Sequence, residues 1–356
     1  MFEKFFHDIE TPNLKNNFFH VKKNLIKTIP KTLIISGGSR NGNHLVWSLL
    51  DGNSQIPYLP GEDKFLSEIF WKSFRNFKKF KKDFLKDKFN FYRKLNGISY
   101  DKWEKVFKKQ IDKKKWAGAY RAKRSAPLQE FPDHYVNINY LQYREYIKKN
   151  IKKNFNFFYF YNFYLKAFSK LSPKKNQKLL KFKYIYAESG LRRELLYLLN
   201  NNANIKCCVP IRKFESFYYS IIKTLFKKSV IKKEYLKEAW ERWYHKTNDY
   251  LFLKKKYPKN ILLIRFEDLE KKQSRKIAVK KICKKLGIKF EQINLTPTHF
   301  KKRVLPNSSF ISILKKNKKS EYRLINEKNK KKYKFPREKL PIQYLKYYKD
   351  LSKYFY

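Results

Sequence analysis

The residues best suited to chemistry stand between Ser36 and Asn43, where the sequence reads SGGSRNGN. A short apolar run, Leu33–Ile35, precedes them, and apolar residues at helical spacing follow over Gly42–Leu50. A strand, a glycine-rich turn and a helix start direct several backbone N–H groups and a helix N-terminus at one point. The segment therefore predicts an anion-binding loop.

The spacing of Gly37 and Gly42 is that of a nucleotide-binding P-loop, GxxxxGK[ST], but the last two positions hold Asn43 and His44. In a P-loop, the lysine binds the β- and γ-phosphates and the hydroxyl residue binds Mg²⁺. Their replacement favours a loop that holds a phosphate or sulfuryl group without a metal-bound triphosphate. No metal is expected at this loop.

Three further polar segments follow later in the chain. Arg212 ends an apolar run, and Ser220 stands eight residues on, so a guanidinium fork and a hydroxyl could converge on a phosphate. The segment 264–269 reads IRFEDL, and we expect Glu267 and Asp268 to cap the helix that follows. A polar loop spans 296–310.

The elements that must position these residues alternate between short apolar strands and amphipathic helices. This alternation predicts an α/β fold with a parallel sheet. Strands are expected at 32–36, 184–187, 207–211 and 261–264, and helices at 42–50, 190–200, 215–226, around 236–244, 279–286 (ended by Gly287) and 341–354.

The chain is expected to form one domain over residues 31–356, preceded by a basic lead-in at 1–30. Residues 64–181 are rich in Lys, Phe and Tyr and carry helical spacing in places, which predicts a mostly helical insertion.

The net charge is +55, from 85 Lys and Arg against 30 Asp and Glu. The lysines are spread along the chain, which indicates a solvated basic surface that attracts anions rather than a specific nucleic-acid site. Three cysteines exclude a disulfide framework. The N-terminus has no signal-peptide pattern, and no apolar run reaches the roughly 20 residues of a membrane span. A cytoplasmic protein without a transmembrane segment is expected.

Taken together and in order, the four segments resemble the sulfotransferases that use 3′-phosphoadenosine 5′-phosphosulfate (PAPS). The family's first motif, SGxPRSGTTLLxxLLDxHPxI, stands here as SGGSRNGNHLVWSLLDGNSQI, and its VRYEDL segment stands as IRFEDL. The resemblance covers residues 32–60 and 184–310 and implies a three-layer, P-loop NTPase-like α/β fold. It also implies metal-free transfer of a sulfuryl group from PAPS to a hydroxyl. Ser39 replaces the family's Pro, and Lys213 and Phe214 replace its Asp-Pro.

The resemblance also implies roles for individual residues. Arg40 takes the place of the family's catalytic cation, and Glu62 that of the general base, with His134 and Glu188 as open alternatives. Arg212 and Ser220 would bind the 3′-phosphate. The residues implied for the 5′-phosphosulfate are Gly38, Ser39, Arg40, Asn41, Gly42, Asn43 and His44, and further nucleotide contacts are implied for Asn307, Ser308 and Ser309.

The acceptor is expected to be a carbohydrate hydroxyl, with a protein tyrosine or a small alcohol as alternatives. Two other functions stay open on the sequence. One is a P-loop kinase or NTPase, and the other is a polyanion-binding protein whose altered loop no longer catalyses.

Overall fold

The structure is a computed structural model. It describes residues 31–38, 40–58, 82, 149–150, 166, 175–187, 189–200, 204–221, 233–270, 272–299, 302–303 and 342–356. The lead-in at 1–30 and nearly all of the insertion at 64–181 lie outside the described residues, so the domain boundaries stay predictions.

Four parallel strands form the central sheet, in the order β2-β1-β3-β4. Leu33 of β1 pairs with Ile185 of β2 on one side and with Lys206 of β3 on the other. β4 extends the sheet beyond β3, with Leu263 opposite Val209. The strand bounds are Thr32–Ile35 (β1), Tyr184–Ala187 (β2), Ile205–Ile211 (β3) and Ile261–Arg265 (β4).

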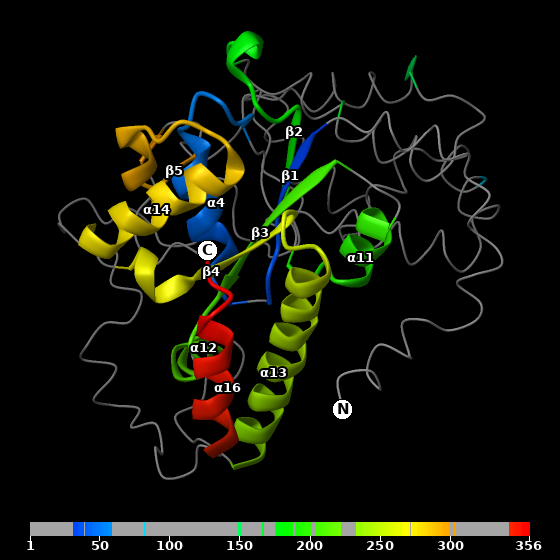
Figure 1. Ribbon diagram of the computed structural model, residues 1–356, viewed down its shortest axis with the longest axis vertical. Coiled ribbons are helices and arrows are strands. Elements are labelled where there is room, and N and C mark those ends of the chain that lie inside the picture. Colours follow the sequence, from blue (N-terminus) through cyan, green and yellow to red (C-terminus); the bar gives the residue numbers. More distant parts are fainter. Residues whose placement is uncertain are drawn as a thin grey trace, which may run out of the picture.

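Helices cover both faces of the sheet, which gives three layers (Figure 1). α4 (Asn43–Asp51) and α14 (Lys272–Leu286) lie on one side, and α11 (Arg193–Asn200) and α13 (Lys233–Lys256) lie on the other. The α/β fold with a central parallel sheet, predicted from the alternation of apolar runs, is confirmed.

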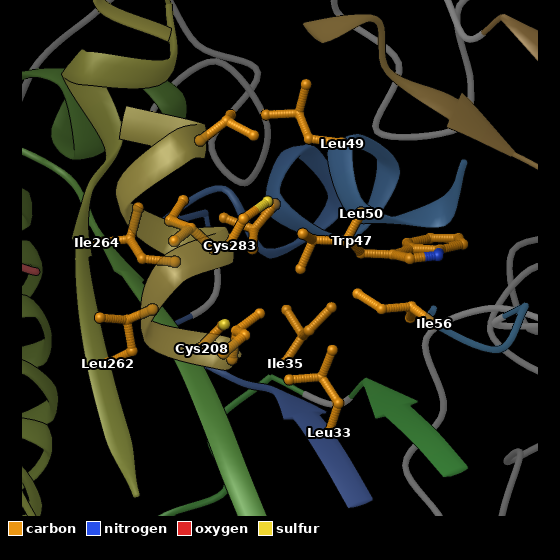
Figure 2. Close-up of a cluster of buried hydrophobic side chains, with 14 of the residues drawn as sticks. Leu33, Ile35, Trp47, Leu49, Leu50, Ile56, Cys208, Leu262, Ile264 and Cys283 are labelled. Carbon is orange, nitrogen blue, oxygen red and sulfur yellow. The ribbon is translucent and has the colours of Figure 1, made fainter. Parts of the chain in front are cut away.

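The core on the first face lies between the strands and the two helices (Figure 2). Ile35 and Cys208 come from β1 and β3, while Leu50 comes from α4 and Cys283 from α14. Each buried aliphatic side chain of this core stabilises the folded state by about 1.5–3 kcal/mol, because its apolar surface is removed from water. All three cysteines are free and buried, as expected for packing residues.

Several helix ends differ from the predicted ones. α11 begins at Arg193 rather than at Gly190, because Gly190 has φ 89° and belongs to the turn before the helix. α14 begins at Lys272, about two turns before the apolar positions that suggested it, and ends before Gly287 as predicted. α16 (Ile342–Ser352) confirms the predicted helix near the end of the chain.

The remaining described elements are short or peripheral. Within the polar loop predicted at 296–310, the structure has a two-stranded antiparallel ribbon. None of the helices among the described residues combines the length and apolar character needed to cross a membrane. The short or peripheral elements are α12 (Phe214–Ile221), η3 (Gln177–Leu179), η5 (Phe266–Leu269), η6 (Gln292–Leu295), β5 (Thr298–His299) and β6 (Lys302–Arg303).

The strand order changes direction between β1 and β3. From β1 the chain goes on to β2 on one side, whereas from β3 it goes on to β4 on the other side. The segments that leave β1 and β3 therefore diverge at the carboxyl edge of the sheet. In open α/β sheets, this is the place where ligands bind.

Candidate functional site

The loop after β1 is held at its start by the segments beside it. The Ser36 hydroxyl accepts a hydrogen bond from the Leu191 N–H (3.1 Å) and lies 2.9 Å from the Tyr250 hydroxyl of α13. The next carbonyl, of Gly37, accepts a bond from the Gly190 N–H (2.9 Å). The loop thus has a fixed position before it reaches the residues predicted to bind an anion.

Two loop glycines are required by close contacts. Gly42 has φ 103°, and a Cβ there would lie 2.2 Å from Cδ2 of Phe266. A Cβ on Gly37 would lie 2.7 Å from Oδ1 of Asn43 and 2.9 Å from the carbonyl oxygen of Pro210. The P-loop-like spacing of these two glycines therefore has a direct steric cause.

The N-terminus of α4 opens onto this loop. Gly42 is its N-cap, no side chain caps it, and its first turn contains no acidic residue. The Leu45 and Val46 N–H groups donate to the Gly42 carbonyl at 2.9 and 3.2 Å, so the first turn is well formed. The positive end of the helix dipole is left without a compensating carboxylate from the helix itself, which favours an anion.

Arg40 occupies a special place in the loop. It is one of two non-glycine residues with positive φ (72°) in the described part of the chain. A left-handed conformation costs a non-glycine residue about 1–2 kcal/mol, and such strain concentrates at ligand sites. The predicted catalytic cation is therefore held in a conformation that the local sequence disfavours.

Arg212 meets this loop from the end of β3. Its side chain is only 4% exposed, and Nη1 donates a bond of 3.4 Å to the Arg40 carbonyl. The guanidinium carbon lies 4.5 Å from the centre of the Phe266 ring, a cation–π contact. Its Nε is buried without a hydrogen-bond partner among the described residues.

The charge of Arg212 is not neutralised by an ion pair in the part of the chain that the structure describes. Burial is the main influence on the pKa of Arg212 and lowers it, and the carboxylates of Glu270 and Glu267 act in the opposite direction. A buried guanidinium without a contacting counter-ion is costly, because water can no longer solvate it. An incoming anion would reduce that cost, so the surroundings of Arg212 favour one.

Glu267 secures the backbone beside Arg212. Its Oε1 accepts a bond from the Lys213 N–H (2.8 Å), immediately before α12, and Oε2 accepts one from the Tyr348 hydroxyl (3.4 Å). Burial raises the pKa of Glu267, and the Lys213 N–H opposes this effect. The prediction that Glu267 and Asp268 cap their own following helix is wrong. Asp268 instead binds Arg265, and no local pattern in the sequence indicates that Glu267 reaches across to the loop after β3.

The two residues that replace the P-loop Lys-[Ser/Thr] pair lie at the start of α4. The Asn43 amide donates to Ser189 Oγ (2.9 Å) and to the Gly37 carbonyl (3.5 Å), so its hydrogens hold the neighbouring loops together. The His44 ring lies edge-on to Trp47, with 5.8 Å between ring centres. Position 43 therefore contributes through its backbone and through loop packing rather than through a side-chain amine.

The structure thus brings Gly38, Arg40, Asn41, Gly42, Asn43, His44 and Arg212 to one edge of the sheet. Ser220 lies in the last turn of α12, the helix that follows Arg212, and its convergence with Arg212 on a phosphate stays a prediction. Ser189 and Tyr250 also position the loop, but the sequence does not predict this role because neither residue belongs to a recognisable motif. Ser39, Glu62, His134, Glu188, Asn307, Ser308 and Ser309 lie outside the described residues.

No cluster of three or more His, Cys, Asp or Glu side chains able to hold a metal ion occurs among the residues with described positions. The groups that the site does offer are a helix N-terminus, a glycine loop and cationic side chains. These are donors for a tetrahedral oxyanion.

Comparisons with known proteins find matches among solved structures only at low sequence identity, and two of these matches are described here. No family model matches the chain, and no curated protein matches it. Among solved structures, the sulfotransferase domain of the Synechococcus PCC 7002 olefin synthase is 14% identical, with a TM-score of 0.42 over 76% of this chain and 78% of that one. The sulfotransferase domain from the curacin biosynthetic pathway is also 14% identical, with a TM-score of 0.44 over 91% of this chain and 98% of that one.

Proposed function

We propose that this chain is a sulfotransferase that moves a sulfuryl group from PAPS to an acceptor hydroxyl. The observation that carries the proposal is the contact between Arg212 and Arg40. A buried guanidinium, unneutralised among the described residues, lies against the backbone of a glycine loop that opens a helix. Two features suited to anion binding, from distant parts of the chain, thus meet at one edge of the sheet.

A ligand with two separate phosphate positions suits this arrangement. The helix N-terminus and the glycine loop offer one anion site, and the unpartnered Nε of Arg212 offers a donor for a second. A nucleotide with a 3′-phosphate and a 5′-phosphosulfate carries both groups. The missing Lys-[Ser/Thr] pair argues against Mg-ATP as the preferred ligand, because those residues bind its β/γ-phosphates and metal.

Different residues of the chain would then bind the two ends of the nucleotide and stabilise the developing charge. The backbone of Gly38 to Asn43 would hold the 5′ group, and Arg212, with Ser220, would hold the 3′-phosphate. When bound, PAPS supplies an activated sulfuryl group. Arg40 would provide a fixed positive charge where negative charge develops on the departing side, the type of stabilisation that is often the largest in catalysis.

The acceptor needs a base that takes its hydroxyl proton, and Glu62 is the residue we propose for it, ahead of His134 and Glu188. A carbohydrate hydroxyl is the proposed acceptor, with a protein tyrosine or a small alcohol as the alternatives. The chain's formal charge of +55 is compatible with acidic glycans.

The experiment is calorimetric titration with adenosine 3′,5′-bisphosphate in metal-free buffer, on the wild type, Arg212→Ala and Arg212→Lys. We expect Arg212→Ala to weaken binding by about ten- to a hundredfold, the scale of a hydrogen bond to a charged group. Arg212→Lys should recover part of the loss, because it restores the charge without the fork.

Lys276→Ala is the matched control, since it removes one positive charge from an exposed position of α14. It should bind like the wild type. Preference for Mg-ATP over the bisphosphate would favour a P-loop kinase or NTPase instead. Binding to any polyanion with the same salt dependence, and no bisphosphate preference, would favour the non-catalytic alternative.

A further inference from the structure

Lys246 is a lysine on the packed face of α13. It follows Trp243 by three residues and precedes Tyr250 by four, and both of these aromatic side chains are 1% exposed. Residues three and four apart share one face of a helix. Lys246 is thus placed on the side of α13 that faces the sheet, where a charged residue breaks the apolar pattern.

The stem of Lys246 reaches the glycine loop. Its Cδ lies 3.6 Å from the position that a Cβ on Gly38 would occupy, and Nζ is two bonds further along. One turn later on the same helix, the Tyr250 hydroxyl lies 2.9 Å from Ser36 Oγ at the start of that loop. Two residues one turn apart on this helix face therefore reach the loop, which fixes α13 as one wall of the anion site.

Positive charges of two arginines act on the amine of Lys246. Burial lowers its pKa, and so do Arg192 and Arg242. The carboxylate of Asp249, on the next turn of α13, is already paired with Arg192. Among the described residues, no hydrogen bond or ion pair joins Lys246 to any acceptor. A half-buried ammonium whose positive form is disfavoured by two arginines, on a stem beside a glycine loop, is an arrangement that an anion would stabilise.

The loop lacks an ammonium of its own. Asn43 stands where a P-loop has its lysine, and its amide is used to hold Ser189 and Gly37. We propose that Lys246 supplies the missing ammonium from α13, on the opposite face of the sheet from α4, and binds the tetrahedral anion at the 5′ position of the nucleotide. This inference rests on the proposed function for the identity of the nucleotide, but its chemistry requires only a phosphate or sulfate in the loop.

The test separates the two ends of the ligand. Lys246→Met keeps the aliphatic stem beside Gly38 and removes the charge. Adenosine 3′,5′-bisphosphate, adenosine 5′-phosphate and adenosine 3′-phosphate are titrated calorimetrically into the wild type, Lys246→Met and Arg212→Lys. We expect Lys246→Met to lower the affinity for the two ligands with a 5′-phosphate by about ten- to a hundredfold. Its affinity for adenosine 3′-phosphate should stay within about twofold of the wild type.

Arg212→Lys should show the reverse pattern, with the loss confined to ligands that carry the 3′-phosphate. If Lys246 had a purely structural role, Lys246→Met would lower the affinity for all three ligands alike. That result would overturn the inference while leaving the proposed function intact. Unchanged binding of all three would overturn it too. Lys276→Met on α14 is the control for the loss of one charge, and thermal melting establishes that each variant is folded.

A last probe covers failure of the proposed function itself. If no adenosine phosphate binds the wild type, pyrophosphate, which has no nucleoside, is tested by its effect on the melting temperature. Stabilisation by pyrophosphate that is lost in Lys246→Met supports the ammonium site independently of the nucleotide. Equal stabilisation of both proteins, or of neither, overturns it.

Discussion

Arg212 Nη1 donates a hydrogen bond to the carbonyl of Arg40, 172 positions earlier in the sequence. The bond joins the segments that follow β1 and β3, whose connections diverge at the carboxyl edge of the sheet. It also links the side chain proposed for the 3′-phosphate to the residue proposed as the catalytic cation. A shift of either residue on ligand binding would therefore strain or break this bond and affect the other.

Arg40→Gly should separate the charge of Arg40 from its backbone conformation. Glycine adopts φ 72° without strain, so the free energy of unfolding should stay within about 1 kcal/mol of the wild type. Loss of the cation should lower kcat by about 10²–10³-fold, the cost of removing one preorganised electrostatic group. Urea denaturation and a sulfuryl-transfer assay measure the two effects. Turnover within about threefold of the wild type would exclude Arg40 from catalysis.

Gly42→Ala should be strongly destabilising. The new Cβ would have a strained φ of 103° and would lie 2.2 Å from a carbon of the Phe266 ring. Strain and overpacking together should lower the free energy of unfolding by about 2–4 kcal/mol. Adding Phe266→Leu to Gly42→Ala should recover the steric part only. Phe266→Leu alone is the control, because truncating this buried ring is itself destabilising. If Gly42→Ala costs as much in the Phe266→Leu background as in the wild type, the ring contact is not the cause.

Glu194→Gln gives a pH-dependent change in stability. Glu194 is 4% exposed, and burial raises its pKa above 4.5. A raised pKa in the folded state means that this group's contribution to stability is full below its unfolded pKa and is lost as the pH rises through the folded value. Because Gln does not titrate, the variant should gain stability relative to the wild type as the pH rises from about 4, and the two are compared from pH 4 to pH 8. The amide oxygen can still accept the bond from the Arg192 N–H (3.1 Å).

The comparison is made by urea denaturation at several pH values, with Glu241→Gln on the exposed side of α13 as the charge-matched control. A stability difference between Glu194→Gln and the wild type that is the same at both ends of that pH range would contradict the prediction.

Glu267→Ala should weaken bisphosphate binding although Glu267 is not proposed to touch the ligand. It removes the acceptor of the Lys213 N–H, so the backbone next to Arg212 loses its anchor. We expect about a tenfold loss in affinity, close to the value of one hydrogen bond to a charged group. Glu267→Gln keeps an acceptor oxygen and should bind more tightly than Glu267→Ala. Equal affinities for the two variants would show that the charge of Glu267, and not the anchor, matters.

The sequence predicts the sheet well and its surroundings less well. The four strands could be predicted because each is a short apolar run, buried on both faces, as parallel strands are. The glycine loop and Arg212 could be placed at one edge because parallel strands end on the same side. The start of α14 could not be predicted, since its first turns, from Lys272, are mostly polar and have no apolar residues at helical spacing.

Long-range polar contacts were beyond sequence reasoning for a different reason. Glu267 reaches the loop of another strand, and Asn43 reaches Ser189, so their partners depend on the strand order rather than on local spacing. Lys246 differs from these two, because it is a charged residue at a position where the helical pattern requires an apolar one. Such an exception to periodicity is visible in the amino-acid sequence alone.

The long connection between β1 and β2 leaves and rejoins the sheet at one place. The Lys181 N–H donates to the Gln55 carbonyl (2.9 Å), and the Lys175 amine donates to the Asp51 and Asn53 carbonyls (2.5 and 2.6 Å). Once these ends are tied, doubling the length of the intervening chain costs only about 0.6 kcal/mol of closure entropy. The fold can therefore carry different inserted segments on an unchanged glycine loop and α4, and under the proposed function a change of acceptor would not require a new core.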